Sequence, residues 1–495
     1  MVDMADRLVT SGWVGIDLGT QSIRVLAVDD DGRRLASATA ALTSTRSAGR
    51  HEQDPAEWIR LTWQLLNEVT SSIDAGVSIR AIAVSGTSGT IVPMDRAGRP
   101  AGPAVMYDDR RGAPRLDEVQ HAGAALWDRL GYRMQATWGL PKVLVMRATA
   151  DPGTVFGHQP DVITAALSGR LLPSDLSSAL KTGADLDAVA WPTDLLDHLD
   201  VPVEALNDVV ASGTVLGTVS AAASRSTGLP RGCAIVAGMT DGCAAQLAAG
   251  AVVPGTWNAV LGTTLVIKGA ADRRFTDPSG AVYAHRAPFN SGWYPGGASS
   301  TGAGAVSALL PHRDLDAVTS EAAALSGIPV VYPLIGKGER FPFVDDTAEP
   351  IWPADPATMS DPELLRAIAF GTAFVERLAF ELLDDVGYDT SGIVHLTGGG
   401  ARNRWWNSIR AQILHRPVAV AGNTEGAAGM ALLAAAAHVG DSKGRPLDAA
   451  AQRMIATPTP VSPADESDDA IEDAYQAFVA QLKQRGYVTE SHALR

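Results

Sequence analysis

Two aspartates lie in similar surroundings, each after an apolar run and before a turn of small residues. Asp17 lies in Val14-Gly-Ile-Asp-Leu-Gly-Thr-Gln-Ser22, and Asp241 lies in Gly238-Met-Thr-Asp-Gly-Cys. A carboxylate near a hydroxyl can accept its proton during phosphoryl transfer, and a second carboxylate can hold Mg²⁺. Taken singly, Asp17 has the alternative of an ordinary hairpin turn and Asp241 that of a helix N-cap. Together they favour an ATP-dependent phosphotransferase, with Asp17 at the metal and Asp241 as the base.

Turns rich in glycine and hydroxyl groups supply candidate phosphate-binding loops. The turn after Asp17 is partly repeated in the later segment Leu261-Gly-Thr-Thr. Backbone N–H groups and hydroxyl donors in such turns can surround phosphate oxygens, although a plain β-turn is an alternative for each. The predicted phosphate contacts are Thr20 and Gln21 in the first turn and Gly262 and Thr263 in the second. Weaker candidates for lining the same site are Gly302 and Gly304.

A glycine triplet, Gly398-Gly-Gly-Ala-Arg-Asn403, follows a strand-like run and precedes a helix-like one. The backbone can approach a nucleotide closely at such a turn, so this segment suits the purine end. It lacks the glycine spacing of a Rossmann loop and the fixed lysine of a Walker loop, which excludes both. Arg402 and Asn403 have the alternative of capping the helix that follows.

Two stretches could recognise a sugar. Ser85-Gly-Thr-Ser-Gly-Thr displays small hydroxyls, including those of Ser85 and Ser88, on a turn after a strand-like run. Tyr107-Asp-Asp109-Arg-Arg places acceptors and donors beside an aromatic face. Polyols need this mixture because each hydroxyl both donates and accepts. For the second stretch, a solvated run of charges is the alternative.

The elements that would position these residues alternate between strand and helix, which predicts an α/β fold. The first helix begins at Pro55 with Asp54 as its N-cap and runs for roughly 18 residues. The pattern restarts near residue 234, and Leu18-Gly-Thr resembles Leu261-Gly-Thr, which hints at a duplicated domain. Strands are expected at 13–18, 23–28, 79–84, 235–237, 257–267 and 393–396, and further helices at 362–386, 405–414, 426–439 and a last one ending near 484.

Composition restricts the class of protein. The 495 residues predict about two to four domains, and 46% of them are hydrophobic, as in a globular chain. A net charge of −15 argues against nucleic acid or anionic lipid as a partner. Two cysteines leave no disulfide framework, and residues 1–8 do not form a secretory signal. No apolar run reaches the ~18 residues of a membrane span. A cytoplasmic protein is therefore expected.

These motifs together resemble the FGGY family of carbohydrate kinases over roughly residues 13–439. The resemblance implies two actin-like, ribonuclease-H-like α/β domains with the active site in the cleft between them. The expected domains are an N-terminal one at 13–252 on the sugar and Mg²⁺-phosphate side and a C-terminal one at 253–440 on the ATP side. A helical tail at 441–495 is expected to pack on the second domain. The resemblance implies ATP and Mg²⁺ as cofactors, Asp17 as the Mg²⁺-associated acid and Asp241 as the catalytic base. By the same resemblance, Thr20, Gln21, Gly262 and Thr263 contact phosphates, and Gly399, Gly400 and Asn403 line the adenosine region.

The sugar loops resemble the D-ribulose kinase-type group, which includes xylulokinase-like chains. Many family members carry Trp-x-Asp-x-Arg where this chain has Tyr107, and xylulokinases typically have Met-Gln-His where the loop here begins at Ser85. We therefore expect phosphorylation of D-ribulose, with Ser85, Ser88, Tyr107, Asp109, Asp17 and Asp241 at the sugar. D-xylulose, glycerol or another polyol, a sugar-independent actin-like ATPase and a binding protein without catalysis are the alternatives. A homodimer is a further expectation that the sequence leaves open.

Overall fold

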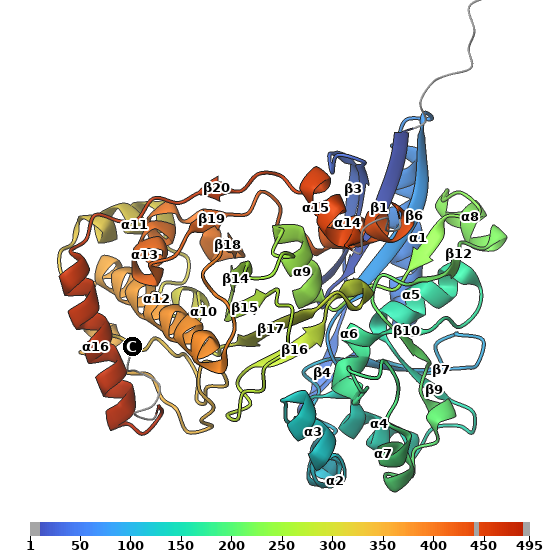
Figure 1. Cartoon of the computed structure of the whole chain (residues 1–495), viewed down its shortest axis with the longest axis horizontal. Helices are drawn as coiled ribbons and strands as arrows, with labels where there is room; N and C mark the ends of the chain where they lie inside the picture. Colours follow the sequence, from blue (N-terminus) through green and yellow to red (C-terminus); the bar gives the residue numbers. More distant parts are fainter. Residues whose placement is uncertain (1–9, 440–444, 489–495) are drawn as a thin grey trace, which may run out of the picture. The chain divides into compact units, whose positions relative to one another are not determined.

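The computed structural model describes residues 10–439 and 445–488, which divide into two compact α/β units (Figure 1). Among the described residues, unit 1 contains those up to 252 together with 285–293 and those within 423–456. Unit 2 contains residues 253–284 and 294–422 and the described residues from 457 onward. The expectation for residues 1–8 lies outside the described residues, as do the last residues of the predicted tail.

Unit 1 is built on a six-stranded sheet in the order β12-β13-β6-β1-β2-β3. The central strand β1 pairs antiparallel with β2 and parallel with β6, and β13 pairs parallel with β6. Helix α1 (Pro55–Ser71) packs against β2 and β3, and Asp54 caps it as expected, accepting from the N–H of Ala56. The strands are β1 (Thr10–Leu18), β2 (Ser22–Asp29), β3 (Arg34–Ala41), β6 (Val77–Gly86), β12 (Val215–Thr218) and β13 (Ala234–Val236).

Unit 2 repeats this arrangement on a seven-stranded sheet in the order β16-β17-β15-β14-β18-β19-β20. Its central strand β14 again pairs antiparallel with the next strand, β15, and parallel with β18. The duplication expected from the repeated Leu-Gly-Thr turns is therefore present in the fold. The strands are β14 (Trp257–Leu261), β15 (Leu265–Gly269), β16 (Tyr283–Arg286), β17 (Trp293–Ala298), β18 (Val394–Thr397), β19 (Val418–Val420) and β20 (Thr459–Pro460).

The segment expected as one strand at 257–267 is instead a hairpin. The N–H of Gly262 donates to the carbonyl of Thr264 at 3.0 Å and closes a tight turn between β14 and β15. Leu261 and Leu265 are direct partners across that turn. Apolar residues on both sides of the turn made the two strands read as one.

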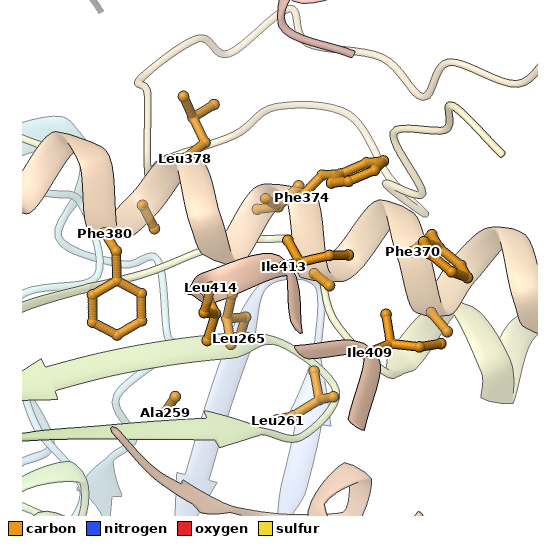
Figure 2. Close-up of a cluster of buried hydrophobic side chains, with 14 of the residues drawn as sticks. Ala259, Leu261, Leu265, Phe370, Phe374, Leu378, Phe380, Ile409, Ile413 and Leu414 are labelled. Carbon is orange, nitrogen blue, oxygen red and sulfur yellow. The ribbon is translucent and has the colours of Figure 1, made fainter. Parts of the chain in front are cut away.

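The core of unit 2 lies between its sheet and two helices, α12 (Asp361–Val386) and α13 (Arg404–Leu414). Figure 2 shows Phe374 and Leu378 of α12 near Ile413 of α13, with Ala259 and Leu261 on the strand side. Their burial anchors the end of β14, from which the second predicted phosphate loop begins. The other helices of unit 2 are α10 (Gly304–Leu309), α11 (Leu315–Ala324) and α16 (Asp468–Gln484).

Helix α14 (Gly426–Val439) belongs to unit 1, although the sequence analysis assigned residues 426–439 to the second domain. It packs against β1, β6 and helix α9 (Asp241–Ala249), as Figure 1 shows. Glycines make the close approach possible, because a Cβ on Gly15 would lie 1.8 Å from the carbonyl oxygen of Ala427. A Cβ on Gly429 would lie 2.0 Å from the carbonyl oxygen of Ala244. Order along the chain therefore does not give the spatial order here.

Unit 1 also contains smaller elements, most of which were not predicted from the sequence. Most of these elements lie between β6 and β13, whereas β4 and β5 precede β6 along the chain. A five-stranded sheet has the order β4-β5-β8-β7-β9, and β10 pairs with β11. The strands are β4 (Thr45–Ser47), β5 (Arg50–Gln53), β7 (Ile91–Met94), β8 (Ala104–Val105), β9 (Val155–His158), β10 (Ser174–Asp175) and β11 (Val209–Val210). The helices are α2 (Leu116–Ala122), α3 (Ala124–Leu130), α4 (Gly139–Arg147), α5 (Gln159–Ser168), α6 (Leu176–Ala179), α7 (Thr193–His198), α8 (Ala221–Thr227) and, after α14, α15 (Pro446–Met454).

Candidate active site

Asp17 lies near the carboxyl end of β1, directly opposite Ser85 on the parallel strand β6. The Ser85 hydroxyl is fully buried and donates to Oδ1 of Asp17 at 2.8 Å. Burial raises the pKa of Asp17, the Ser85 hydrogen bond and the charge of Arg24 lower it, and the nearby Glu425 raises it. The net result is a pKa above the ordinary aspartate value. Oδ2 of Asp17 accepts no hydrogen bond from the described residues, so it is available as a metal ligand.

The turn after Asp17 is fixed by backbone contacts, and its side chains are partly or fully exposed. The N–H of Gly19 donates to the carbonyl of Ser22 at 3.0 Å. Gln53 donates its amide hydrogen to the carbonyl of Thr20 at 2.7 Å. The side chain of Thr20 is half-buried and that of Gln21 is exposed. Both predicted phosphate contacts therefore sit on a turn whose main chain is held from within unit 1.

Helix α14 begins against Asp17. A Cβ added to Gly426, its first residue, would lie 2.9 Å from both Cγ and Oδ2 of Asp17. Only glycine leaves room for the carboxylate at this helix start. Gly426 was not predicted as a site residue, because most of the chain separates it from Asp17 and no local pattern joins the two.

Asp241 is the first residue of α9, and Thr240 occupies the N-cap position. The alternative of Asp241 as the N-cap residue is therefore wrong. Asp241 is exposed, and its Oδ1 accepts from the N–H of Gly242 at 2.7 Å. Behind it, the N–H of Thr240 donates to the Ser177 hydroxyl at 3.2 Å, and Ser177 hydrogen bonds to Nδ1 of His285 at 3.0 Å. The helix start is thus held by buried polar groups while its carboxylate faces solvent.

The sheet of unit 1 brings the two acids to the same edge. The strands β1, β6 and β13 are parallel neighbours, and Asp17, Ser85 and the segment leading to Asp241 lie at their carboxyl ends. A bridge between Gly86 and Thr240 continues the pairing beyond β13. The carboxyl edge of parallel strands is where open α/β sheets usually bind ligands. Two residues separated by more than two hundred positions therefore share one face of unit 1.

The two predicted sugar stretches are joined by a buried lysine that the sequence analysis did not single out. Lys142 on α4 donates to the carbonyl of Gly89 at 3.0 Å and to that of Met106 at 2.7 Å. These carbonyls belong to the loop after β6 and to the residue before Tyr107. Burial lowers the pKa of Lys142 to about 7. The hydroxyl oxygen of Ser88 is buried and has no hydrogen-bond partner among the described residues.

Asp109 points into the protein, whereas Tyr107 is 40% exposed. The Asp109 carboxylate accepts from the backbone N–H of His51 at 2.7 Å and from the Arg111 guanidinium at 2.9 and 2.8 Å. Burial opposes its charge, but the hydrogen bonds from Arg111 and His51 hold the pKa of Asp109 below its usual range. The carboxylate is fully buried, and these contacts hold the loop. The stretch 107–111 is thus not the solvated charge run that was its alternative.

In unit 2, a pocket of about 300 Å³ brings together the residues predicted for the nucleotide: Gly262, Thr263, Gly399, Gly400 and Asn403. Its other walls are mostly apolar and comprise Leu261, Ala303, Val306, Ser307, Leu315, Leu365 and Trp406. A pocket of this size with apolar walls and a few polar groups is typical of a small-molecule site. A larger hollow of about 480 Å³ in unit 1, around Arg96 and Arg147, contains none of the predicted site residues.

The glycine triplet shapes this pocket. A Cβ on Gly398 would lie 2.6 Å from the carbonyl oxygen of Leu261. A Cβ on Gly400 would lie 2.5 Å from Cδ2 of the same leucine. A Cβ on Gly399 would meet nothing within 4 Å. Asn403 caps α13 through Oδ1, which accepts from the N–H of Trp406 at 3.0 Å, so its capping alternative is correct and it also lines the pocket. Gly398 and Gly400 are needed for packing, and Gly399 leaves space for a ligand.

The described residues contain no group of three or more His, Cys, Asp or Glu side chains arranged to hold a metal ion. Magnesium is usually bound by one or two carboxylates together with phosphates and water, so a single carboxylate such as Asp17 is compatible with it. Both cysteines, Cys233 and Cys243, are buried and unpaired. No helix in the described ranges combines the length and apolar character needed to cross a membrane.

Comparison with known proteins gives matches along nearly the whole chain. The N-terminal domain of the FGGY family of carbohydrate kinases matches residues 12–248, and its C-terminal domain matches residues 280–438. The chain is 30% identical to a xylulose kinase of Streptomyces coelicolor, over 92% of this chain and 93% of that protein. It is 29% identical to a xylulose kinase of Streptomyces rubiginosus, over 96% of this chain and 97% of that protein. Its fold is similar to the crystal structure of xylulose kinase from Rhodospirillum rubrum, with a TM-score of 0.83, 25% identity and coverage of 96% and 99%.

Proposed function

The chain belongs to the FGGY family of carbohydrate kinases, and we propose that it transfers the γ-phosphoryl group of ATP to the terminal hydroxyl of a ketopentose. As a family member it is a sugar kinase, which is a phosphotransferase. The observation that carries the proposal is the pocket of unit 2, which collects all five residues expected there for the nucleotide. The acids lie in unit 1 and the pocket in unit 2.

We assign the adenosine part of ATP to the apolar walls of the pocket and its phosphates to the loop at Gly262 and Thr263. The N–H of Gly262 already closes the turn by donating to the carbonyl of Thr264, so the proposed donors to phosphate oxygens are the N–H and the hydroxyl of Thr263. Such donors stabilise the charge that develops in phosphoryl transfer. Asp17 is the proposed magnesium ligand through Oδ2, since Oδ1 is already engaged by Ser85. Bound Mg²⁺ would neutralise part of the phosphate charge.

Asp241 is the proposed base. Its carboxylate is exposed and lies in the first turn of α9. In the reaction, the sugar hydroxyl oxygen forms a bond to the γ-phosphorus while the bond from that phosphorus to ADP breaks. The hydroxyl proton passes to Asp241 late in this step. The roles of the other site residues are to bind and orient the two substrates.

Two ketopentoses are candidates for the substrate. The sequence predicts D-ribulose from the loop at Ser85 and from Tyr107. D-xylulose, its epimer at C3, is supported by the similarity to the two Streptomyces proteins named xylulose kinase. The Ser85 hydroxyl already donates its hydrogen to Asp17, which weakens the argument that a serine at this position recognises the sugar. Ser88 and Tyr107 then become the proposed sugar contacts that distinguish the two.

The test is ADP release with Mg-ATP against D-ribulose, D-xylulose, L-ribulose, ribitol, glycerol and a blank without sugar. Stimulation by one ketopentose over the blank supports the proposal and identifies the substrate. Stimulation by glycerol alone would replace the ketopentose with a polyol. Equal ADP release in every well, including the blank, would contradict sugar phosphorylation and favour a sugar-independent ATPase.

A further inference from the structure

Glu339 is a buried acid for which the proposed reaction has no direct use. Its side chain is 2% exposed and accepts five hydrogen bonds. Oε2 accepts from the hydroxyls of Ser299 at 2.8 Å, Thr301 at 3.1 Å and Tyr332 at 2.9 Å. Oε1 accepts from the backbone N–H of Ser300 at 2.5 Å and from that of Arg340 at 2.9 Å. No cation forms an ion pair with it within the described part of the chain. Neutral donors alone therefore compensate this buried charge.

Three of the five donors belong to the segment 299–304, which we call the support segment. This segment is bonded through its backbone to the turn at Gly262 and Thr263. The N–H of Ala303 donates to the carbonyl of Gly262 at 2.9 Å, and the N–H of Gly304 to that of Thr263 at 3.0 Å. Next to the turn, the N–H of Leu265 donates to the carbonyl of Thr301 at 2.7 Å. The support segment thus fixes both ends of the proposed phosphate loop.

The backbone of the support segment is packed closely against the backbone of the loop. A Cβ on Gly302 would lie 2.6 Å from Cα of Thr264, and one on Gly304 would lie 2.8 Å from the carbonyl oxygen of Thr263. A displacement of the support segment is therefore passed directly to the loop, because close-packed backbone has no room to absorb it.

We propose that Glu339 is a positioning residue for the nucleotide phosphates, acting through the support segment on the loop at Gly262 and Thr263. The inference rests on the proposed function, because it takes this loop as the phosphate site. Glu339 touches no substrate in this scheme. Its five hydrogen bonds hold the loop in the geometry that a triphosphate requires, so binding involves little reorganisation of the loop.

The two oxygens of Glu339 allow a variant that should fold. Glutamine can place its amide oxygen toward the two backbone N–H groups, which can only donate. Its NH2 group then faces the hydroxyls of Ser299, Thr301 and Tyr332, and its two hydrogens can donate to two of them once those hydroxyls rotate to accept. Glu339→Gln therefore keeps up to four of the five contacts and loses the charge-assisted strength of all of them. Thr301→Val is a second variant, which removes one donor on the support segment and leaves the carboxylate in place.

The test measures the Kd for Mg-ATP by titration calorimetry without sugar, together with the KM for the active ketopentose and the Tm. For Glu339→Gln we expect the Kd to rise about tenfold, as the loss of a charge-assisted hydrogen bond implies. For Thr301→Val we expect a smaller rise in the same direction. The KM for sugar should stay within about twofold, since the sugar stretches lie in unit 1. The matched control is Glu349→Gln, ten positions along and exposed, which should leave all three values unchanged.

A Kd for Mg-ATP unchanged in both stable variants would overturn the proposal. A lowered Tm with an unchanged Kd would do the same, because it would reduce Glu339 to a structural role. The calorimetric readout separates this result from a failure of the proposed function. Wild-type protein that binds Mg-ATP but phosphorylates no sugar would contradict the kinase proposal while leaving the effect of Glu339 on Kd measurable.

Discussion

Ser85 on β6 donates its hydroxyl hydrogen to Oδ1 of Asp17 on β1 at 2.8 Å, across two parallel strands in which they are direct partners. The serine is fully buried, so its hydroxyl serves the carboxylate and not the solvent. This hydrogen bond favours the ionised form of Asp17 against the burial that disfavours it. Ser85 therefore helps to keep Asp17, the proposed metal ligand, in its ionised form.

Replacing Ser85 should move the acid side of the pH–rate profile. In Ser85→Ala, the pKa of Asp17 rises further because one hydrogen bond to its charged form is lost. If ionised Asp17 holds Mg²⁺, activity then needs a higher pH, and the Mg²⁺ concentration for half-maximal rate rises about tenfold. The pH profile of kcat/KM and an Mg²⁺ titration check this. Ser78→Ala on the same strand should leave both unchanged, and an unmoved acid limb in Ser85→Ala would contradict the role of Ser85.

Asp241→Asn should remove turnover without removing nucleotide binding. Loss of a general base lowers kcat by about 10²- to 10⁴-fold, and Asp241 lies in unit 1, whereas the pocket at Gly399 lies in unit 2. The Kd for Mg-ATP should therefore stay within about twofold of the wild type. Because the side chain is exposed, the Tm should hardly change. Single-turnover kinetics and calorimetry provide the two values.

The control for that experiment is Asp200→Asn, which changes the same chemical group in the same unit. The Asp200 side chain is 99% exposed, and Asn is tolerated well at its φ of 54°. It should leave kcat unchanged. A near-normal rate in Asp241→Asn would remove Asp241 from the mechanism.

The glycine triplet offers a matched pair of substitutions. Gly399→Val adds atoms in open space beside the pocket, so it should fold normally and raise the Kd for Mg-ATP by about tenfold or more through steric overlap. Gly400→Ala places a Cβ about 2.5 Å from Leu261 and should instead lower the stability by about 1–3 kcal/mol. Thermal unfolding and calorimetry distinguish the two. Normal ATP affinity in Gly399→Val would place the nucleotide elsewhere.

Local sequence patterns predicted those parts of the fold that depend on local chemistry. The repeated Leu-Gly-Thr turns begin equivalent hairpins, β1–β2 and β14–β15, because a glycine turn after a buried strand has few other conformations. Asp54 capped α1 for the same local reason. Local sequence does not show which sheet a helix packs against, and α14 accordingly lies in unit 1 and not in unit 2. Its position depends on the clearance at Gly15 and Gly429, which periodicity does not reveal.

The same limit applies to the candidate site. Gly262, Thr263 and the glycine triplet were predicted as phosphate and nucleotide contacts because such loops have recognisable glycine patterns, and Gly262, Thr263, Gly399 and Gly400 line one pocket. The direction of the Asp109 carboxylate was not predictable, since it depends on the backbone N–H of His51, which lies on β5, far from Asp109 along the chain. Lys142 gave no signal either, because a lysine is normally expected at the surface. Its burial shows only in three dimensions.

Lys142→Met should reveal the cost of that burial as a pH-dependent difference in stability. Burial lowers the pKa of Lys142 to about 7, the charges of Asp109 and Asp108 raise it, and those of Lys181 and Arg111 lower it. Between this value and the ordinary value of 10.5, the unfolded chain binds more protons than the folded chain. The wild type therefore gains stability as pH rises through this window, and the variant does not. The stability difference should grow by at most about 1.4 kcal/mol per pH unit.

Urea unfolding at several pH values within that window measures this slope. Arg147→Met on the same helix is the control, because a guanidinium stays charged throughout and should give a difference independent of pH. Above the folded pKa, neutral Lys142 still donates to the carbonyls of Gly89 and Met106, so its loss should also raise the KM for the sugar. A pH-independent stability difference in Lys142→Met would mean that the lysine keeps its charge inside the protein. An unchanged KM would mean that it does not hold the sugar loops.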